Sequence, residues 1–416
     1  VTALERNTAL SQRERDNYYG ELEVILSFLA FNSITGMSEH HRRAYKLLSG
    51  APQTLSKQGI WTFGAPSVLG LYLRTGCSLR QTVEDMQECM PPYYLLSGWH
   101  GAGAAELTEA EALLLQGRVD EMDMPLQKAY YQAEKHGQEC ITICCDFLEM
   151  QRDLCRGVYS SKAEAYSRYQ WQLQPWKQSM LLNTADMCAG FYYALLGKPE
   201  YIPSWLTDGN GQQPSVLYPA RPCRNYISAQ CLLAQGQYTE LLVRWSDWEQ
   251  ECRPYSNFLC LLYLQVQRAA AFAGRGDVTS CRASLKQALA MAEADKLVLP
   301  LAQNIALLRP YLEQEAQGEY SAAAAAALHL GQQLEAGQGQ IMSIRFAEAG
   351  LQELTEQELQ IAQLAAARHT NREIAQRLSL SEGTIKQYLN KIFAKLQIDA
   401  AAKNKRHQLE RFFPNS

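Results

Sequence analysis

Residues 354–396 read LTEQELQIAQLAAARHTNREIAQRLSLSEGTIKQYLNKIFAKL. Thr355 and Thr370 each precede a run of helix-forming residues, and a hydroxyl at that position accepts a hydrogen bond from the open first turn of a helix. Glu358 and Glu373 follow the two threonines at the spacing of a capping box, in which side chain and backbone bond reciprocally. The pattern predicts two helices with sharply defined starts, followed closely by a third.

The third predicted helix begins after Ser381, which is its N-cap. One stripe along it is apolar at helical spacing, formed by Ile385, Leu389, Ile392, Phe393 and Leu396. The opposite face carries Lys386, Gln387 and Asn390 near the helix start. Lysine can donate to guanine, and glutamine or asparagine can pair with adenine, so this face is a candidate for reading bases in the major groove of double-stranded DNA. An ordinary solvated helix face is the alternative.

These segments resemble the wingless LuxR-type helix-turn-helix of bacterial transcription regulators. The matching runs are Leu-Thr-x-x-Glu, Asn-Arg-Glu-Ile-Ala, Ser-x-x-Thr-Ile-Lys and Ile-Phe-Ala-Lys-Leu, within residues 354–398. The resemblance implies a four-helix DNA-binding domain over residues 354–416, in which Lys386, Gln387 and Asn390 face the bases. It further implies a set of residues near the DNA phosphates, namely Asn371, Ser381, Thr384, Lys391 and Lys395.

The segment departs from the family pattern in two places. Arg368 stands where the family usually has glycine, and a left-handed conformation there would cost roughly 1 kcal/mol. The basic residue that usually follows Lys-Leu is missing, because residues 397–401 read QIDAA. Phosphate contacts could come instead from Lys403, Lys405 and Arg406. The alternative is that residues 354–416, called here the head, bind DNA only weakly.

Charge is distributed unevenly along the chain. Residues 354–416 carry a net charge of +4, whereas the remaining residues carry −8. A phosphate backbone is therefore attracted only to the C-terminal part. An acidic body with a basic tail is more typical of a regulator than of a protein that coats nucleic acid.

Upstream of this part, glycine recurs at intervals of 39 to 42 residues. Fixed periods in this range indicate helical arrays, because each repeat must stack on its neighbours to bury its apolar face. We interpret each glycine as the left-handed end of one helix, followed by a returning helix. This interpretation predicts an all-α fold whose residues 1–335 form a superhelical array of about eight tetratricopeptide-like hairpins. The glycines are Gly36, Gly76, Gly117, Gly157, Gly197, Gly236, Gly276 and Gly318.

Apolar residues at the 3.6-residue period predict individual helices within this array. The expected helices cover residues 109–116, 123–136, 256–273 and 279–295. A linker is expected over residues 336–353, where Gly337, Gly339 and Gly350 would let the C-terminal head move. Beyond the third head helix, Leu409, Phe412 and Phe413 either pack into the head or support a homodimer or higher oligomer on DNA.

An array of forty-residue hairpins before a LuxR-type head is similar to the C-terminal part of MalT-like regulators. The resemblance implies that the array senses a small-molecule or protein effector, but the sequence identifies no effector-binding residue. MalT-like regulators also carry an upstream nucleotide-binding module, which no segment here matches. Because the chain starts at Val1 without methionine, we expect a C-terminal piece of a longer protein; a naturally short regulator is the alternative.

Motifs of catalysis and metal binding are not found in the sequence. Gly197-Lys198 is followed by Pro199 and lacks the upstream glycine of a P-loop. The 12 cysteines are scattered, with no pattern of a zinc site or disulfide framework. No run of about eighteen apolar residues could span a membrane. We therefore expect a cytoplasmic protein that is not an enzyme and uses no metal or cofactor.

The most direct reading is a DNA-binding transcription regulator in which the array senses an effector and controls the head. The alternative is a protein-interaction scaffold, in which the array binds a partner protein and the head is vestigial or only tethers it. Paired aromatic residues such as Tyr93-Tyr94 and Tyr192-Tyr193 either line a binding groove or form the core between repeats.

Overall fold

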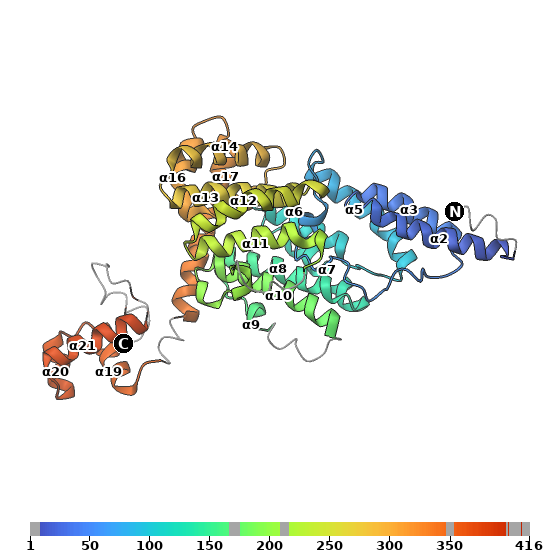
Figure 1. Ribbon diagram of the computed structural model, residues 1–416. Helices are drawn as coiled ribbons and strands as arrows, with labels where there is room; N and C mark the ends of the chain where they lie inside the picture. Colours follow the sequence, from blue (N-terminus) through green and yellow to red (C-terminus); the bar gives the residue numbers. More distant parts are fainter. Residues whose placement is uncertain are drawn as a thin grey trace. The chain divides into compact units, whose positions relative to one another are not determined.

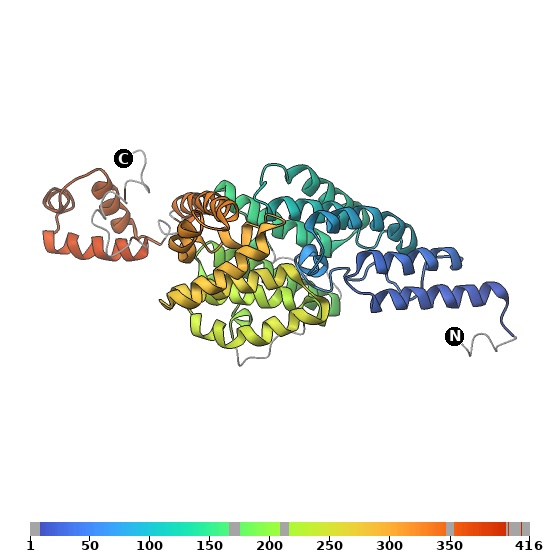
Figure 2. The same ribbon diagram turned by 90° about the horizontal axis from the view of Figure 1, so that it is seen from above.

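The computed structural model describes residues 9–165, 175–208, 216–346, 353–396, 398 and 409. Over these residues the chain is helical, and the one extended pairing is an isolated bridge between Arg74 and Asn257 (Figures 1 and 2). The predicted all-α class is confirmed. The chain divides into two compact units, the first comprising Val1–Cys155 with Ser160–Leu334 and the second Arg156–Tyr159 with Glu335–Ser416.

The N-terminal end of the first unit is a helical hairpin packed on a third helix. α2 (Gln12–Leu29) starts at a capping box made by Ser11 and Glu14. It packs along α3 (Ile34–Leu47), and α3 packs in turn against α5 (Leu79–Ser97). The segment between α3 and α5 is irregular except for the short helix α4 (Val68–Tyr72), all of whose residues are buried.

Several helices in the middle of the first unit pack against the next helix along the chain, and each such contact covers an apolar face. α5 contacts α6, α6 contacts α7, and α10 contacts α11. The helices are α6 (Ala104–Leu115), α7 (Asp123–His136), α8 (Glu139–Arg156), α9 (Lys162–Ala165), α10 (Pro175–Leu195), η2 (Pro199–Tyr201), η3 (Ser204–Leu206), η4 (Tyr218–Ala220) and α11 (Arg221–Ala234).

α13 (Phe258–Gly274) is the most enclosed helix of the later part of this unit. It contacts α11, α12, α14 and α16, and most of its residues are buried, which explains why its sequence is apolar nearly all round. The surrounding helices are α12 (Tyr238–Cys252), η5 (Arg253–Tyr255), α14 (Val278–Glu293), α15 (Leu299–Ala302), α16 (Ile305–Glu315) and α17 (Ser321–Ile341). The four segments predicted as helices from apolar periodicity lie largely within α6, α7, α13 and α14, although residues 116, 256–257 and 294–295 lie beyond the helix ends.

Only some of the recurring glycines are the left-handed helix ends that the repeat period predicted. Several follow a helix and have positive φ, among them Gly117 at 75° and Gly236 at 69°. Gly36 instead lies inside α3, where a Cβ would come within 2.9 Å of the Ser33 hydroxyl, and Gly318 does not have positive φ. Gly197 is followed by the short turns η2 and η3 where a returning α-helix was expected. Gly36 and Gly318 are therefore not the left-handed helix ends that the prediction of about eight hairpins assigned to them.

The first part of the segment predicted as a linker, residues 336–353, is helical. α17 continues to Ile341, with Gly337 and Gly339 inside it, and a π-helix, η6, follows over Met342–Phe346. Glycine lowers helix stability by about 1 kcal/mol relative to alanine but does not end a helix that other residues support. Residues 347–352, which include Gly350, lie outside the described part of the chain.

Two glycines that have open space where a Cβ would lie should respond in opposite ways to the same substitution. Gly236→Ala should weaken the α11 end by about 1 kcal/mol, since φ at this position is 69°. Gly339→Ala should stabilise α17 by about 0.5 to 1 kcal/mol, because this glycine is helical and nothing lies within 4 Å of the added atom.

Hydrogen exchange of the peptides that cover each helix measures both effects in the intact chain. Equal signs for the two substitutions would contradict the assigned backbone conformations.

Candidate nucleic-acid interface

Three helices form the described part of the head, and their starts agree with the sequence analysis. α19 (Glu356–Ala366) and α20 (Asn371–Leu378) both begin at complete capping boxes. In the first, the Thr355 amide donates to Glu358 at 2.8 Å while the Glu358 amide donates to the Thr355 hydroxyl at 3.3 Å. α21 (Glu382–Lys395) begins at Ser381, whose hydroxyl accepts from the Thr384 amide at 3.1 Å.

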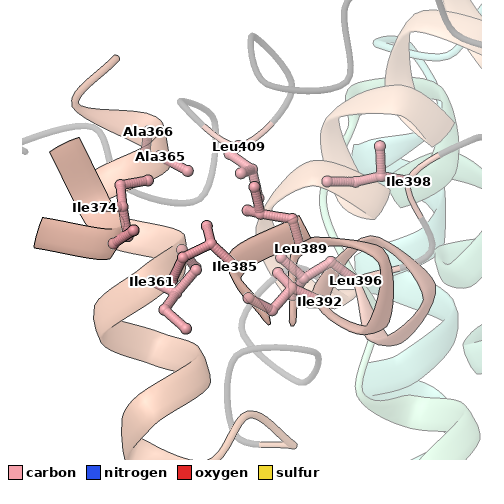
Figure 3. Close-up of a cluster of buried hydrophobic side chains, with 12 residues drawn as sticks. Ile361, Ala365, Ala366, Ile374, Ile385, Leu389, Ile392, Leu396, Ile398 and Leu409 are labelled. Carbon is pink, nitrogen blue, oxygen red and sulfur yellow. The ribbon is translucent and has the colours of Figure 1, made fainter. Parts of the chain in front are cut away.

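The three helices enclose a small apolar core (Figure 3). Ile361 of α19, Ile374 of α20 and Ile385 of α21 are each fully buried in it. Four apolar residues, called here the α21 stripe, are Ile385, Leu389 and Ile392 of α21 and its C-cap Leu396, and all four are buried as predicted. Phe393 is partly buried against the same core.

Leu409 is fully buried in this core, as Figure 3 shows, so its predicted packing role is confirmed for that residue. Phe412 and Phe413 lie outside the described residues. The buried position of Leu409 leaves it unable to present its side chain to a second copy of the chain.

The turns between the head helices contain two non-glycine residues in the left-handed region. Arg368, after α19, has φ 65°, which is the conformation anticipated from its place in the pattern. Ser379, the C-cap of α20, has φ 54°. Each costs about 1 kcal/mol relative to glycine, so the core and caps must outweigh this cost.

Two polar contacts hold α21 on α19. The Tyr388 hydroxyl donates to the Gln357 side-chain oxygen at 2.9 Å. The Lys395 ammonium donates to the Glu358 carboxylate at 2.6 Å and to the Glu353 carbonyl at 3.1 Å. Lys395 was predicted to lie near phosphate; the structure pairs it inside the head, because the end of α21 passes beside the carboxylate that caps α19.

The position of the polar face of α21 follows from helix geometry. Successive residues of an α-helix are about 100° apart around its axis, so the α21 stripe occupies an arc of about 60°. Lys386, Gln387 and Asn390, called here the α21 polar face, lie outside this arc, at about 90°, 170° and 130° from its centre. All three are exposed, and none makes a hydrogen bond or ion pair with another described residue.

Of the residues predicted to lie near phosphate, Lys391 is exposed, has no partner among the described residues, and continues the edge of the polar face. The Ser381 and Thr384 hydroxyls lie 2.7 Å apart and bond to each other at the first turn of α21. Asn371 is half-buried at the first position of α20. Lys403, Lys405 and Arg406 lie outside the described residues.

Arg372 is a candidate that the sequence analysis missed. It is exposed at the second position of α20 and has no partner among the described residues. Its position in the sequence could have identified it, because Arg372 lies in the first turn of a capped helix, where the helix dipole already favours an anion.

Two carboxylates of the head have lowered pKa values because they accept hydrogen bonds. The bond from Lys395, together with the Thr355 amide, lowers the pKa of Glu358. The Thr370 amide and hydroxyl lower the pKa of Glu373. A group whose folded pKa lies below its unfolded value stabilises the fold above the unfolded pKa, and that stability is lost as pH falls through the folded pKa.

Glu358→Gln should therefore reduce the stability of the head by about 1 kcal/mol at pH 7, since glutamine can still cap α19 but cannot form an ion pair with Lys395. The difference from the unsubstituted chain should shrink as pH falls below about 4.5, where the unfolded carboxylate takes up its proton. Urea dependence of hydrogen exchange in residues 353–396 measures this stability.

Glu356→Gln is the matched control, because Glu356 is exposed in the same first turn. An equal loss in both variants, or a Glu358→Gln effect that does not change with pH, would contradict the role given to the ion pair.

The segment that contains this site matches a known protein family. Residues 352–403 match the family described as bacterial regulatory proteins, luxR family. A search of curated proteins returned no match to the chain. Among the described residues, no helix is long and apolar enough to cross a membrane, and no cluster of three or more His, Cys, Asp or Glu could hold a metal ion.

The match covers the three capped helices and their core except for Leu409, and it does not include the first unit. A LuxR-family helix-turn-helix is a DNA-binding element of transcription regulators, and it points to a non-enzymatic role. The C-terminal part of this chain is therefore a LuxR-type helix-turn-helix domain.

Proposed function

We propose that this protein is a DNA-binding regulator of transcription in which α21 enters the major groove and reads bases with its polar face. The observation that carries the proposal is the α21 polar face itself. Its lysine, glutamine and asparagine have the donors and acceptors for base edges, and no described residue occupies them. They lie opposite a buried stripe, so the helix can meet the DNA without disturbing its own core.

Phosphate contacts would position this face. We assign them to Lys391, to the hydroxyls of Ser381 and Thr384, to Asn371 and to Arg372, all of which lie on α21 or α20 or at their starts. Such contacts set register and orientation but carry no sequence information. We give Lys395 a different role, which is to hold α21 on α19 through Glu358.

The first unit would supply the regulatory input, by binding a small molecule or a protein that changes the activity of the head. Its support is the resemblance of a helical array before a LuxR-type head to MalT-like regulators, together with the packed helices of that unit. Binding of two copies of the chain to two DNA half-sites would fit such a regulator. A scaffold that uses the array alone is the competing function, and it predicts no sequence preference on DNA.

Replacing Lys386 or Asn390 with alanine should weaken binding to the preferred DNA site by about 1 to 3 kcal/mol, which is roughly 5- to 150-fold. It should also relax the preference at the base pairs that each residue reads. Selection of the preferred site from random duplexes, followed by mobility shifts with each variant, measures both effects.

Gln360→Ala is the control, because Gln360 is exposed on α19 and lies outside the proposed contact surface. If all variants select the same DNA site, the α21 polar face does not read bases. If the unsubstituted chain selects no site, the competing function as a protein-interaction scaffold is favoured.

Lys391→Ala should act differently, because a phosphate contact is independent of sequence. We expect weaker binding by a similar factor on specific and random duplexes, and a salt dependence of the logarithm of affinity reduced by about 1 unit. Titrations of fluorescent duplexes at several salt concentrations measure the slope. Lys46→Ala, an exposed lysine of α3, is the matched control. A slope unchanged by Lys391→Ala would show that this lysine meets no phosphate.

A further inference from the structure

The first unit contains a cavity of about 220 Å³ at its N-terminal end, between α2, α3, α5 and the irregular segment 54–63. An apolar cavity of about 150 Å³ is known to take up benzene, so this volume suits one substituted ring or a small fused pair. No residue within it belongs to the head.

The walls of the cavity are mainly apolar and aromatic. Trp61 and Tyr72 lie stacked with their ring centroids 5.3 Å apart, and Met86 and Met90 of α5 are also buried in the lining. Methionine adapts its shape to a ligand and contacts aromatic rings favourably. The lining contains no Asp, Glu, Lys or Arg. A flat apolar body is therefore suited to this site, and a charged one is not.

Buried polar groups in the lining lack the partners that burial normally requires. His41 is 7% exposed and lies against Tyr93, with the ring centroids 4.6 Å apart and the ring planes inclined by 39°. It makes no hydrogen bond within the described residues. The Ser38 hydroxyl, on the turn of α3 before it, has only the weakly bonding Cys89 thiol beside it. An unpaired buried polar group costs about 1 to 3 kcal/mol, so these groups favour a ligand that can bond to them.

A second histidine narrows the chemistry further. His100 uses Nδ1 with the Tyr93 hydroxyl at 2.7 Å, and its buried Nε2, near the Gly59 backbone, has no hydrogen-bond partner among the described residues. Burial lowers the pKa of both His41 and His100 to about 4. Both rings are neutral at pH 7, so each can donate or accept but neither offers a positive charge to an anion.

The cavity opens at the segment before Gly59. Thr54 and Ser56 are exposed there, and Phe28 of α2 is 43% exposed beside them. Glu21 of α2 holds this segment by accepting from the Thr54 amide at 3.0 Å and from its hydroxyl at 2.5 Å. The mouth is therefore lined by exposed residues while the deeper walls are buried, which is the form of a ligand pocket.

We propose that this cavity binds a neutral aromatic molecule of one ring or two fused rings that carries a hydroxyl or carbonyl group. The ring system lies among Trp61, Tyr72 and the methionines, and the polar substituent meets His41 and the Ser38 hydroxyl. The ligand fills the space between the α2–α3 hairpin and α5, so it stabilises their packing by mass action. Only the further step, from binding to control of the head, rests on the proposed regulatory function.

Calorimetry with the full chain at pH 7.5 tests the site with three probes of similar size. 4-Ethylphenol should bind at one saturable site and raise the temperature at which the first unit unfolds. Ethylbenzene, which lacks the hydroxyl, should bind about tenfold more weakly. 4-Hydroxybenzoate should not bind, because its carboxylate would be buried without a cation.

His41→Phe keeps a ring against Tyr93 but removes the nitrogens. In this variant the preference for 4-ethylphenol over ethylbenzene should fall from about tenfold to about twofold or less, while ethylbenzene still binds and reports an intact cavity. His329→Phe is the matched control, since His329 is on α17 and outside the cavity lining, and it should leave both affinities unchanged. Ser38→Leu should fill the cavity and abolish binding of both probes.

The proposal is overturned if 4-ethylphenol fails to bind, if 4-hydroxybenzoate binds as well, or if His41→Phe keeps the preference while ethylbenzene binds normally. Mobility shifts with the selected DNA site, run with and without 4-ethylphenol, separate this proposal from the regulatory one. If the probe binds without changing the affinity for DNA, the cavity is a ligand site but does not control DNA binding. Selective DNA binding without probe binding keeps the regulator and removes the ligand site.

Discussion

The head depends on the burial of the α21 stripe against Ile361 and Ile374. Once these apolar side chains lie in one core, helix geometry directs Lys386, Gln387 and Asn390 away from it. Each capping box ensures that its helix begins at the right residue, and the contacts of Tyr388 and Lys395 hold α21 on α19. The base reading proposed for this face would thus rest on a core that does not itself contact DNA.

Charged side chains of the head differ in whether they have a partner within the chain. Lys395 and Glu358 form an ion pair that links the end of one helix to the start of another, so that pair belongs to the support of α21. Lys386 and Lys391, on the exposed side of the same helix, have no partner among the described residues. The difference matters because a binding surface performs well only when the element that carries it is rigidly held.

The first unit follows a less regular logic. Its helices pack on their neighbours, but the recurring glycines serve different purposes: Gly117 and Gly236 allow left-handed helix ends, and Gly36 allows close packing inside a helix. Irregularity of this kind leaves space between elements, and the cavity beside Trp61 and His41 lies where the α2–α3 hairpin meets α5 and an irregular segment. A strictly repeating array would have offered equivalent grooves, whereas this unit offers an individual pocket of mixed chemistry.

Sequence alone was sufficient for the all-α class, for the head helices and their caps, and for the buried stripe, because periodicity and capping are local properties that a few neighbouring residues determine. It also identified which α21 side chains are exposed. Only the tertiary structure showed that Lys395 is paired with Glu358, that Gly36 and Gly339 are helical, and that Ser38, His41 and His100 line one cavity with Trp61. Those facts depend on residues distant in the chain coming together, and the local spacing of residue types carries no record of such contacts.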